Sequence, residues 1–444
     1  MIAIVTLACL IYVAPDLATL TMGLDGVVYA SIAQQLAAGE GGFWALPFFD
    51  VVATRFVDHP PLGIWLQSLL FTFFGDPFWV ERLFCVLMIV GVALALNHLL
   101  LTMAQPVSEA TDNNLAWWAL LLFFLVPVVT RTLKNNHLES MVVLVTLIAV
   151  ACAWRNRDQI RWQVLVGVLC SVGFLIKGPV ALFPLVAPLL IAWFIDRSLV
   201  QGIKNSFIAA TTCLVLIEIV LLIPDAQSVM AAYFKSQVVA SIEGTRVSSH
   251  GRGYLLEHLF RSLVVLAVAV SIVGLIQKQR PRWSREALVM FLIGLSASLP
   301  LLISGRHFRH YLLPAMPFFA IAAALLIQPK VAPNKNWLVG GLASLAVTLI
   351  VVTSINFGEK GKDGELLDEL EQIALTATEQ KTNTVGFCIP EPVRQSYLRR
   401  YSGIRSTTVD DFTAAEVWLC SEAPGDGAEK IAEYSDGLSL WQVQ

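Results

Sequence analysis

The chain has 444 residues, of which 56% are hydrophobic and only 14% are charged, and its mean hydropathy is +0.69. This composition excludes an ordinary soluble protein, because several apolar runs approach the roughly 20 residues that span a bilayer core of about 30 Å. The net charge of −3 and the scattered basic residues exclude a nucleic-acid-binding protein. We therefore expect a protein that crosses the membrane several times.

Apolar runs recur along the chain and predict eleven crossings. The first run has no basic start and no clear cleavage site, so we interpret it as a retained helix and not as a secretory signal. A shorter run, 62–74, is bounded by Pro61 and Gly75 and is expected to lie along the interface or to re-enter the membrane. The predicted crossings are 2–22, 79–101, 115–132, 138–154, 163–176, 180–195, 205–224, 258–276, 286–304, 311–328 and 337–356.

The basic residues predict the orientation of these crossings. Short loops rich in Lys and Arg, such as 155–161 and 278–285, are expected in the cytoplasm. With eleven crossings, the loops that hold the polar motifs then share the opposite face with the C-terminal tail. Basic residues prefer the cytoplasmic side, yet four cations fall on the predicted outer face. We expect them to bind a ligand: Arg131, Lys134, Arg306 and Arg309.

Beyond Gly358 the composition becomes that of a soluble protein. The segment 366–378 has helical spacing, and 384–389 and 416–420 have the pattern of buried strands. We predict a membrane domain over residues 1–357 and a small α/β domain on the outer side over residues 358–444. Cys388 and Cys420 lie on its two predicted strands, where either a disulfide or two free thiols is compatible with the pattern.

Two carboxylates are candidates for catalysis on the predicted outer face. Asp25 directly follows the first apolar run and opens a polar stretch at 29–38, and Glu139 lies where one predicted span ends and the next begins. Charged side chains at membrane depth are costly and mark functional sites by default, so one of the pair is expected to act as a base. The alternative is that each is a solvated charge at a helix end, with Asp25 capping the following helix.

A group of cations suggests the other half of the reaction. Lys177 interrupts a long apolar stretch, and Arg306, Arg309 and Tyr311 lie at the start of a predicted span. Lysine and arginine at the membrane rim, with tyrosine and histidine donors, are suited to a phosphate at headgroup depth. The alternative is that these side chains merely extend to the interface from helix ends.

These motifs together resemble the type C membrane glycosyltransferases, in particular the bacterial branch that includes the lipid A aminoarabinose transferase and relatives of the protein O-mannosyltransferases. Five ordered segments carry the resemblance over most of the membrane part. They are Asp25 with Tyr29-Ala30-Ser31-Ile32-Ala33, then Asp58-His59-Pro60-Pro61-Leu62-Gly63-Ile64-Trp65, then Phe74-Gly75 followed by Arg82-Leu83, then Leu175-Ile176-Lys177-Gly178-Pro179, and Tyr311-Leu312-Leu313-Pro314-Ala315-Met316-Pro317.

The resemblance implies a polytopic α-helical fold of about 11 to 13 transmembrane helices with interfacial helices in the first outer loop. It implies a polyprenyl-phosphate sugar as donor, and a lipid, glycan or protein as acceptor, in a bacterial inner membrane with the active site facing the periplasm. Asp25 and Glu139 match the acidic catalytic positions, and His59, where relatives commonly have lysine, joins the phosphate-binding residues. No nucleotide or redox cofactor is implied. Relatives can hold a divalent metal, for which Asp58 and His250 are the candidates here.

Two other classes of protein remain open at this level. A secondary transporter of a polar or anionic substrate also places charges inside a helical bundle, but it is expected to show paired hydrophobic halves, and no such internal repeat is found. A membrane-anchored binding protein would use the tail as its working part. Eleven spans are far more than an anchor requires, which favours the enzyme.

Overall fold

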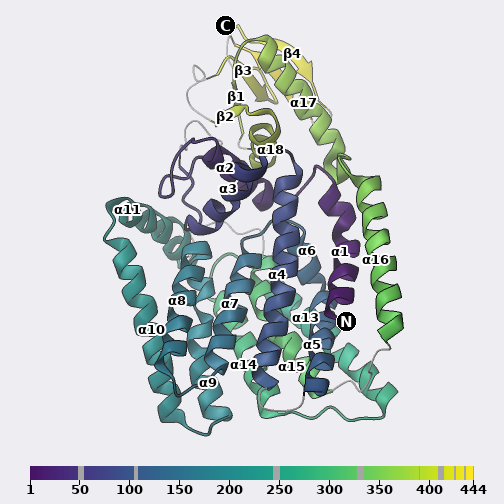
Figure 1. The fold of residues 1–444 in the computed structure, drawn as a ribbon. Helices are drawn as coiled ribbons and strands as arrows, with labels where there is room; N and C mark the ends of the chain where they lie inside the picture. Colours follow the sequence, from purple (N-terminus) through teal and green to yellow (C-terminus); the bar gives the residue numbers. More distant parts are fainter. Residues whose placement is uncertain are drawn as a thin grey trace. The chain divides into compact units, whose positions relative to one another are not determined.

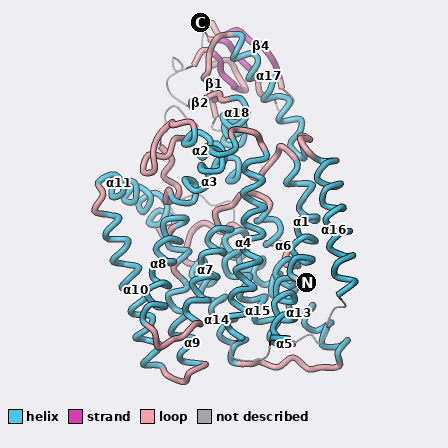
Figure 2. Tube along the Cα trace, in the orientation of Figure 1, coloured by secondary structure: helices cyan, strands magenta, loops and turns pink. Residues whose placement is uncertain are grey.

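The computed structural model describes residues 1–48, 55–104, 109–243, 251–327, 335–389, 391–408, 415–424, 427–434 and 437–443 (Figure 1). Helices dominate, and all strands in this described part belong to one sheet near the C-terminus (Figure 2). The fold class predicted from the apolar runs is therefore confirmed. The helices of the first half are α1 (Ile2–Ala18), α2 (Leu24–Ala37), α3 (Leu62–Phe74), α4 (Trp79–Ala104), α5 (Glu109–Leu125), α6 (Pro127–Leu133), α7 (Glu139–Trp154), α8 (Ile160–Lys177), η1 (Pro179–Ala181), η2 (Phe183–Val186), α9 (Ala187–Phe194) and α10 (Leu199–Leu221).

The second half of the chain is helical as far as Glu379, and beyond that residue the strands and the helix α18 follow. Its helices are α11 (Pro224–Tyr233), the π-helix η3 (Phe234–Val239), α12 (Ala240–Ile242), α13 (Arg252–Gln277), α14 (Arg285–Ser298), η4 (Leu299–Leu302), η5 (Arg309–Ala315), α15 (Met316–Leu326), α16 (Lys335–Asn356), η6 (Gly361–Asp363), α17 (Gly364–Glu379) and α18 (Pro392–Ser402). The strands are β1 (Thr384–Phe387), β2 (Arg405–Thr408), β3 (Val417–Cys420), β4 (Glu429–Glu433) and β5 (Ser439–Gln442).

The long apolar helices make this a multi-pass membrane protein. Within the described residues, seven helical segments are long and apolar enough to cross a membrane, and a bent pair raises the number to eight. Shorter apolar helices coincide with three further predicted crossings, namely α1, α7 and the segment Pro179–Phe194. The predicted crossing at 115–132 is not one straight helix, because α5 and α6 meet at 81°. Pro127 begins α6 and cannot continue the hydrogen bonding of α5, which explains the break.

The chain divides into two compact units that do not follow the sequence in single pieces. The first unit comprises Met1–Leu17, Val57–Gly63 and Leu83–Ile355, and it contains most of the membrane helices. Its core is one continuous apolar cluster. Helix α8 packs on both α7 and α10, and α15 packs on α5 and α14, so these helices run side by side in the bundle (Figure 1).

The second unit joins the C-terminal tail to two early segments of the chain, Ala18–Phe56 and Ile64–Arg82. The tail resumes this unit at Asn356, next to the predicted domain boundary at 358. Helix α18 packs against α2, and Val27 of α2 belongs to the same apolar core as Leu370 and Phe387 of the tail. The tail and the first outer loop therefore share a core.

The sheet of the second unit has the strand order β2-β1-β3-β5-β4. The first three strands are parallel to one another, and β5 pairs antiparallel with both β3 and β4. Trp418 on β3 is completely buried, and Gly386 on β1 leaves the room that its indole ring needs. Cys388, which directly follows β1, forms a disulfide with Cys420 at the end of β3. The alternative left open by the sequence is thereby resolved in favour of a disulfide.

Candidate functional site

A cavity of about 510 Å³ lies within the first unit, and several of the polar residues singled out by the sequence line it. Its polar wall includes His59, Lys177, Arg306 and Tyr311, all predicted to bind phosphate. Asp58, the candidate metal ligand, lies on the same wall. The rest of the lining is largely apolar and includes Val180, Leu182, Phe183, Val238, Leu301 and Ile303. The cavity lining thus combines cationic side chains with apolar ones.

Lys177 occupies the last position of α8, where the helix dipole favours a cation. Gly178 follows with φ +82°, which ends the helix, and Pro179 begins η1. The Lys177 Nζ lies 2.8 Å from Oε1 of Glu139, which lies in the first turn of the neighbouring helix α7. The side chains of Lys177 and Glu139 are only 4% and 1% exposed. Glu139 is therefore the buried counter-ion of Lys177 and does not itself line the cavity.

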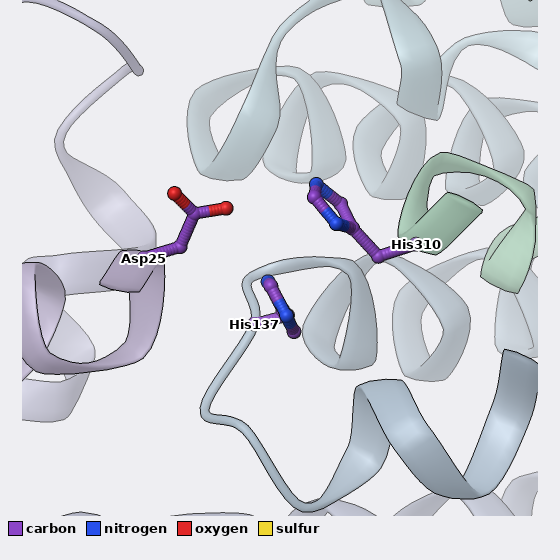
Figure 3. A group of neighbouring side chains, drawn as sticks. All are labelled: Asp25, His137 and His310. Atoms are coloured by element: carbon purple, nitrogen blue, oxygen red, sulfur yellow. The ribbon is translucent and has the colours of Figure 1, made fainter. Parts of the chain in front are cut away.

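Two histidines lie beside this ion pair. His310 Nε2 is 3.6 Å from Glu139 Oε1, and the His310 ring stacks on the ring of His137 with centroids 4.4 Å apart. Figure 3 draws the two rings close to parallel. Neither histidine was singled out from the sequence as a neighbour of Glu139. His137 lies two residues before Glu139, which is the signal that could have pointed to it. Nothing in the sequence connected His137 with His310.

Arg306, Arg309 and Tyr311 come from one segment but have different environments. Arg306 lines the cavity and lies 6.0 Å from the centroid of the Phe308 ring. The Tyr311 ring centroid is 5.7 Å from Lys177 Nζ, within reach of a cation–π interaction. Arg309 is exposed and is not part of the cavity lining. Arg309 and Tyr311 belong to the 3₁₀-helix η5, whereas Arg306 lies before it.

Two further cavity residues, Tyr233 and Gln237, were missed by the sequence analysis. The Tyr233 hydroxyl donates a hydrogen bond to the carbonyl oxygen of Lys177 at 3.4 Å, and the Gln237 amide donates to the Asp58 carboxylate. Burial and the nearby Asp58 carboxylate raise the pKa of the Tyr233 hydroxyl above its ordinary value. Gln237 lies in the π-helix η3, a rare geometry that is frequent at functional sites. No sequence pattern marked it.

The predicted metal site is only partly within the described residues. His250 lies outside them. Asp58 accepts the hydrogen bond from Gln237, and within the described part of the chain it belongs to no group of three potential metal ligands. Metal binding at Asp58 is therefore not supported by its described surroundings and stays a prediction of the resemblance.

Asp25, the other predicted catalytic residue, belongs to the second unit. It lies in the first turn of α2 and is partly exposed, and its carboxylate projects away from the helix (Figure 3). Gly23 occupies the N-cap position, with no side-chain hydrogen bond. Asp25 is therefore not the cap of this helix, although the start of a helix favours a negative charge.

Comparisons with known proteins agree with this architecture. Residues 58–223 match the sequence profile of the family described as dolichyl-phosphate-mannose-protein mannosyltransferase. ArnT from Cupriavidus metallidurans, in a crystal structure bound to undecaprenyl phosphate, superposes with a TM-score of 0.65 at 15% identity over 99% of this chain and 97% of that one. The apo structure of the same ArnT gives 0.63 at 15% identity, over 97% and 95% of the two chains. No curated protein sequence matches significantly. The chain therefore has the fold of ArnT, and over residues 58–223 it matches the model of the mannosyltransferase family.

Proposed function

We propose that the protein is a membrane glycosyltransferase that moves a sugar from a polyprenyl-phosphate donor to a lipid, glycan or protein acceptor. The observation that carries this proposal is the two-part lining of the cavity, with the cations Lys177 and Arg306 near apolar side chains such as Phe183 and Leu301. A polyprenyl phosphate has the same two parts, an anionic head and a hydrocarbon chain. The ArnT structure that this fold resembles contains undecaprenyl phosphate.

The phosphate-binding roles follow from the chemistry of the side chains. Lys177 and Arg306 supply positive charge, and His59 and Tyr311 supply hydrogen-bond donors. The pairing of Lys177 with Glu139 holds the ammonium group at the end of α8. We therefore assign Glu139 the role of orienting Lys177 and not that of a base. Arg309, exposed on the same segment, is assigned to the approach of the phosphate by long-range attraction.

In the proposed reaction, a hydroxyl or phosphate oxygen of the acceptor attacks the anomeric carbon from the side opposite the phosphate. The bond between this carbon and the phosphate oxygen breaks, and the configuration inverts. The proton of an attacking hydroxyl passes to Asp25, and polyprenyl phosphate leaves with its charge balanced by Lys177 and Arg306. Positioned base catalysis of this kind contributes about 10²- to 10⁴-fold.

The orientation is also part of the proposal. Short loops rich in basic residues, such as 155–161 and 278–285, favour the cytoplasmic side, which assigns the cavity and the C-terminal part to the periplasm of a bacterial inner membrane. A disulfide such as Cys388–Cys420 persists in an oxidising compartment, which supports the same assignment.

Two measurements test the function. Mass spectrometry of the purified protein is expected to detect retained polyprenyl phosphate, and Arg306→Gln is expected to lose it, whereas Arg261→Gln, which alters an exposed arginine in an i,i+4 pair on α13, keeps it. Proteoliposomes are then given a panel of undecaprenyl-phosphate sugars and bacterial envelope acceptors. Transfer of one of these sugars by the parent protein, and its loss in Asp25→Asn, is the expected outcome. Transport of the sugar without transfer would favour the transporter.

A further inference from the structure

Residues 20–22, which lie shortly before α2, are held by hydrogen bonds to other parts of the second unit. Tyr397 of α18 is buried, and its hydroxyl oxygen accepts a hydrogen bond from the Met22 backbone N–H at 2.7 Å. The same hydroxyl donates to the Met22 carbonyl oxygen at 2.9 Å. Both polar backbone groups of Met22, three residues before Asp25, therefore depend on one tyrosine from the C-terminal tail.

Neighbouring side chains hold Leu20 and Thr21 in the same way. The Leu20 carbonyl oxygen accepts hydrogen bonds from the Tyr401 hydroxyl at 2.8 Å and from Arg82 at 2.7 Å. Arg82 also donates to the Thr21 carbonyl oxygen at 3.2 Å, and the Leu20 N–H donates to the Glu359 carbonyl oxygen at 2.8 Å. The backbone from residue 20 to 22 is thus fixed by hydrogen bonds.

The other side of Asp25 is fixed by packing. Val27, two residues after Asp25, is fully buried in the apolar core that also contains Leu370, Phe387 and Tyr397. Asp25 itself is partly exposed between these two anchors. The backbone that carries this carboxylate is thus restrained on both sides.

We propose that Tyr397 is a positioning residue, which holds the backbone before α2 so that the Asp25 carboxylate has one fixed direction. This inference rests on the proposed function of Asp25 as the base. A base must be held within about half an ångström of its productive position, and a misplacement of about 1 Å can cost 10²-fold in rate. The C-terminal tail is then a part of the catalytic apparatus through its contact with the first outer loop.

The test uses the full chain with Tyr397→Phe, which keeps the ring and removes both hydrogen bonds. Tyr434→Phe is the matched control, because Tyr434 is buried in the same core and its hydroxyl has no hydrogen-bond partner among the described residues. Hydrogen–deuterium exchange of the amides of residues 22–28 is expected to accelerate at least tenfold in Tyr397→Phe and to stay unchanged in Tyr434→Phe. This measurement requires no substrate.

The catalytic consequence is measured with the undecaprenyl-phosphate sugar that the panel above identifies. Tyr397→Phe is expected to lower kcat about tenfold or more with the KM for the donor within about twofold, and to shift the pH profile of kcat/KM. Unchanged exchange, an unchanged kcat, or an equal loss in Tyr434→Phe would overturn the positioning role. Full activity of Asp25→Asn would instead refute Asp25 as the base, while the exchange result would still report the anchoring of the loop.

Discussion

The hydroxyl of Tyr233 occupies the space that a side chain on Gly178 would need. A Cβ atom on Gly178 would overlap the Tyr233 Oη and lie 2.8 Å from its Cζ. Gly178 also has φ +82° and ψ −151°, a conformation essentially confined to glycine. Two independent constraints therefore require glycine at position 178. It ends α8, and it admits the tyrosine that holds the Lys177 carbonyl oxygen at the cavity wall.

Gly178→Ala is expected to destabilise the protein and to weaken binding of undecaprenyl phosphate. The backbone strain alone costs of order 1–3 kcal/mol, and the displaced Tyr233 ring adds to it. Thermal unfolding in detergent and retention of undecaprenyl phosphate measure the two effects. Gly253→Ala is the control, because nothing lies within 4 Å of a Cβ atom at that position of α13. Equal behaviour of the two variants would contradict the close packing.

Much of the helical part could be predicted because the thickness of the bilayer fixes the length of an apolar run. The predicted crossing at 258–276 lies inside α13, and that at 138–154 coincides with α7 to within one residue. Hydropathy does not report backbone direction, so the sharp bend between α5 and α6 was not anticipated. The shared core of the tail and the first outer loop was also missed, because pairings between distant segments leave no periodic signal.

The sequence indicated which residues could belong to the site, but not which side chains contact one another. The cations Lys177 and Arg306 stood out because charge is rare in apolar surroundings, and both line the cavity. The pairing of Lys177 with Glu139 depends on the antiparallel packing of α7 and α8, which the sequence alone does not specify. An amide in a segment between two predicted crossings carries no signal of its own, so the contact of Gln237 with Asp58 could not be foreseen.

The buried ion pair of Lys177 and Glu139 is expected to be important for stability. Removing one partner of such a pair typically destabilises a protein by about 3–5 kcal/mol, because the other charge stays buried without compensation. Glu139→Gln is therefore expected to lower the thermal midpoint strongly. Added undecaprenyl phosphate is expected to raise the midpoint more in this variant than in the parent, since its phosphate replaces the lost counter-charge of Lys177.

The control for this experiment is Asp16→Asn, which breaks the more exposed pair between Asp16 and Lys134. Pairs in contact with water contribute little, about 0–1 kcal/mol, so the midpoint is expected to change only slightly. If undecaprenyl phosphate stabilises Glu139→Gln no more than the parent, Lys177 does not contact the phosphate.

The second unit is expected to lose stability in alkali. Burial raises the pKa of Tyr397 from 10.0 to about 12, with a smaller opposing effect from its hydrogen bond to Met22. A group whose pKa is raised in the folded state contributes stability that is present below the unfolded pKa and is lost as the pH rises toward the folded pKa. Stability is therefore expected to fall between pH 10.0 and about 12. In an ultraviolet difference titration, the Tyr397→Phe variant is expected to have one fewer tyrosine with a raised pKa than the parent protein. Titration of that group near its ordinary pKa would contradict the burial effect.

The guanidinium of Arg400 binds two carboxylates of the early segments. It lies 2.8 Å from Glu81 and 2.7 Å from Asp76, and the side chains of Arg400 and Glu81 are 1% and 0% exposed. Arg400→Met would leave the Glu81 charge buried without its ion-pair partner, so accelerated amide exchange is expected throughout the second unit. Lys430→Met removes a surface pair with Glu433 and is expected to leave exchange unchanged. The double variant Arg400→Met/Glu81→Leu removes both buried charges and should recover part of the loss. An equal effect of Arg400→Met and Lys430→Met would mean that Arg400 does not join the tail to the early segments.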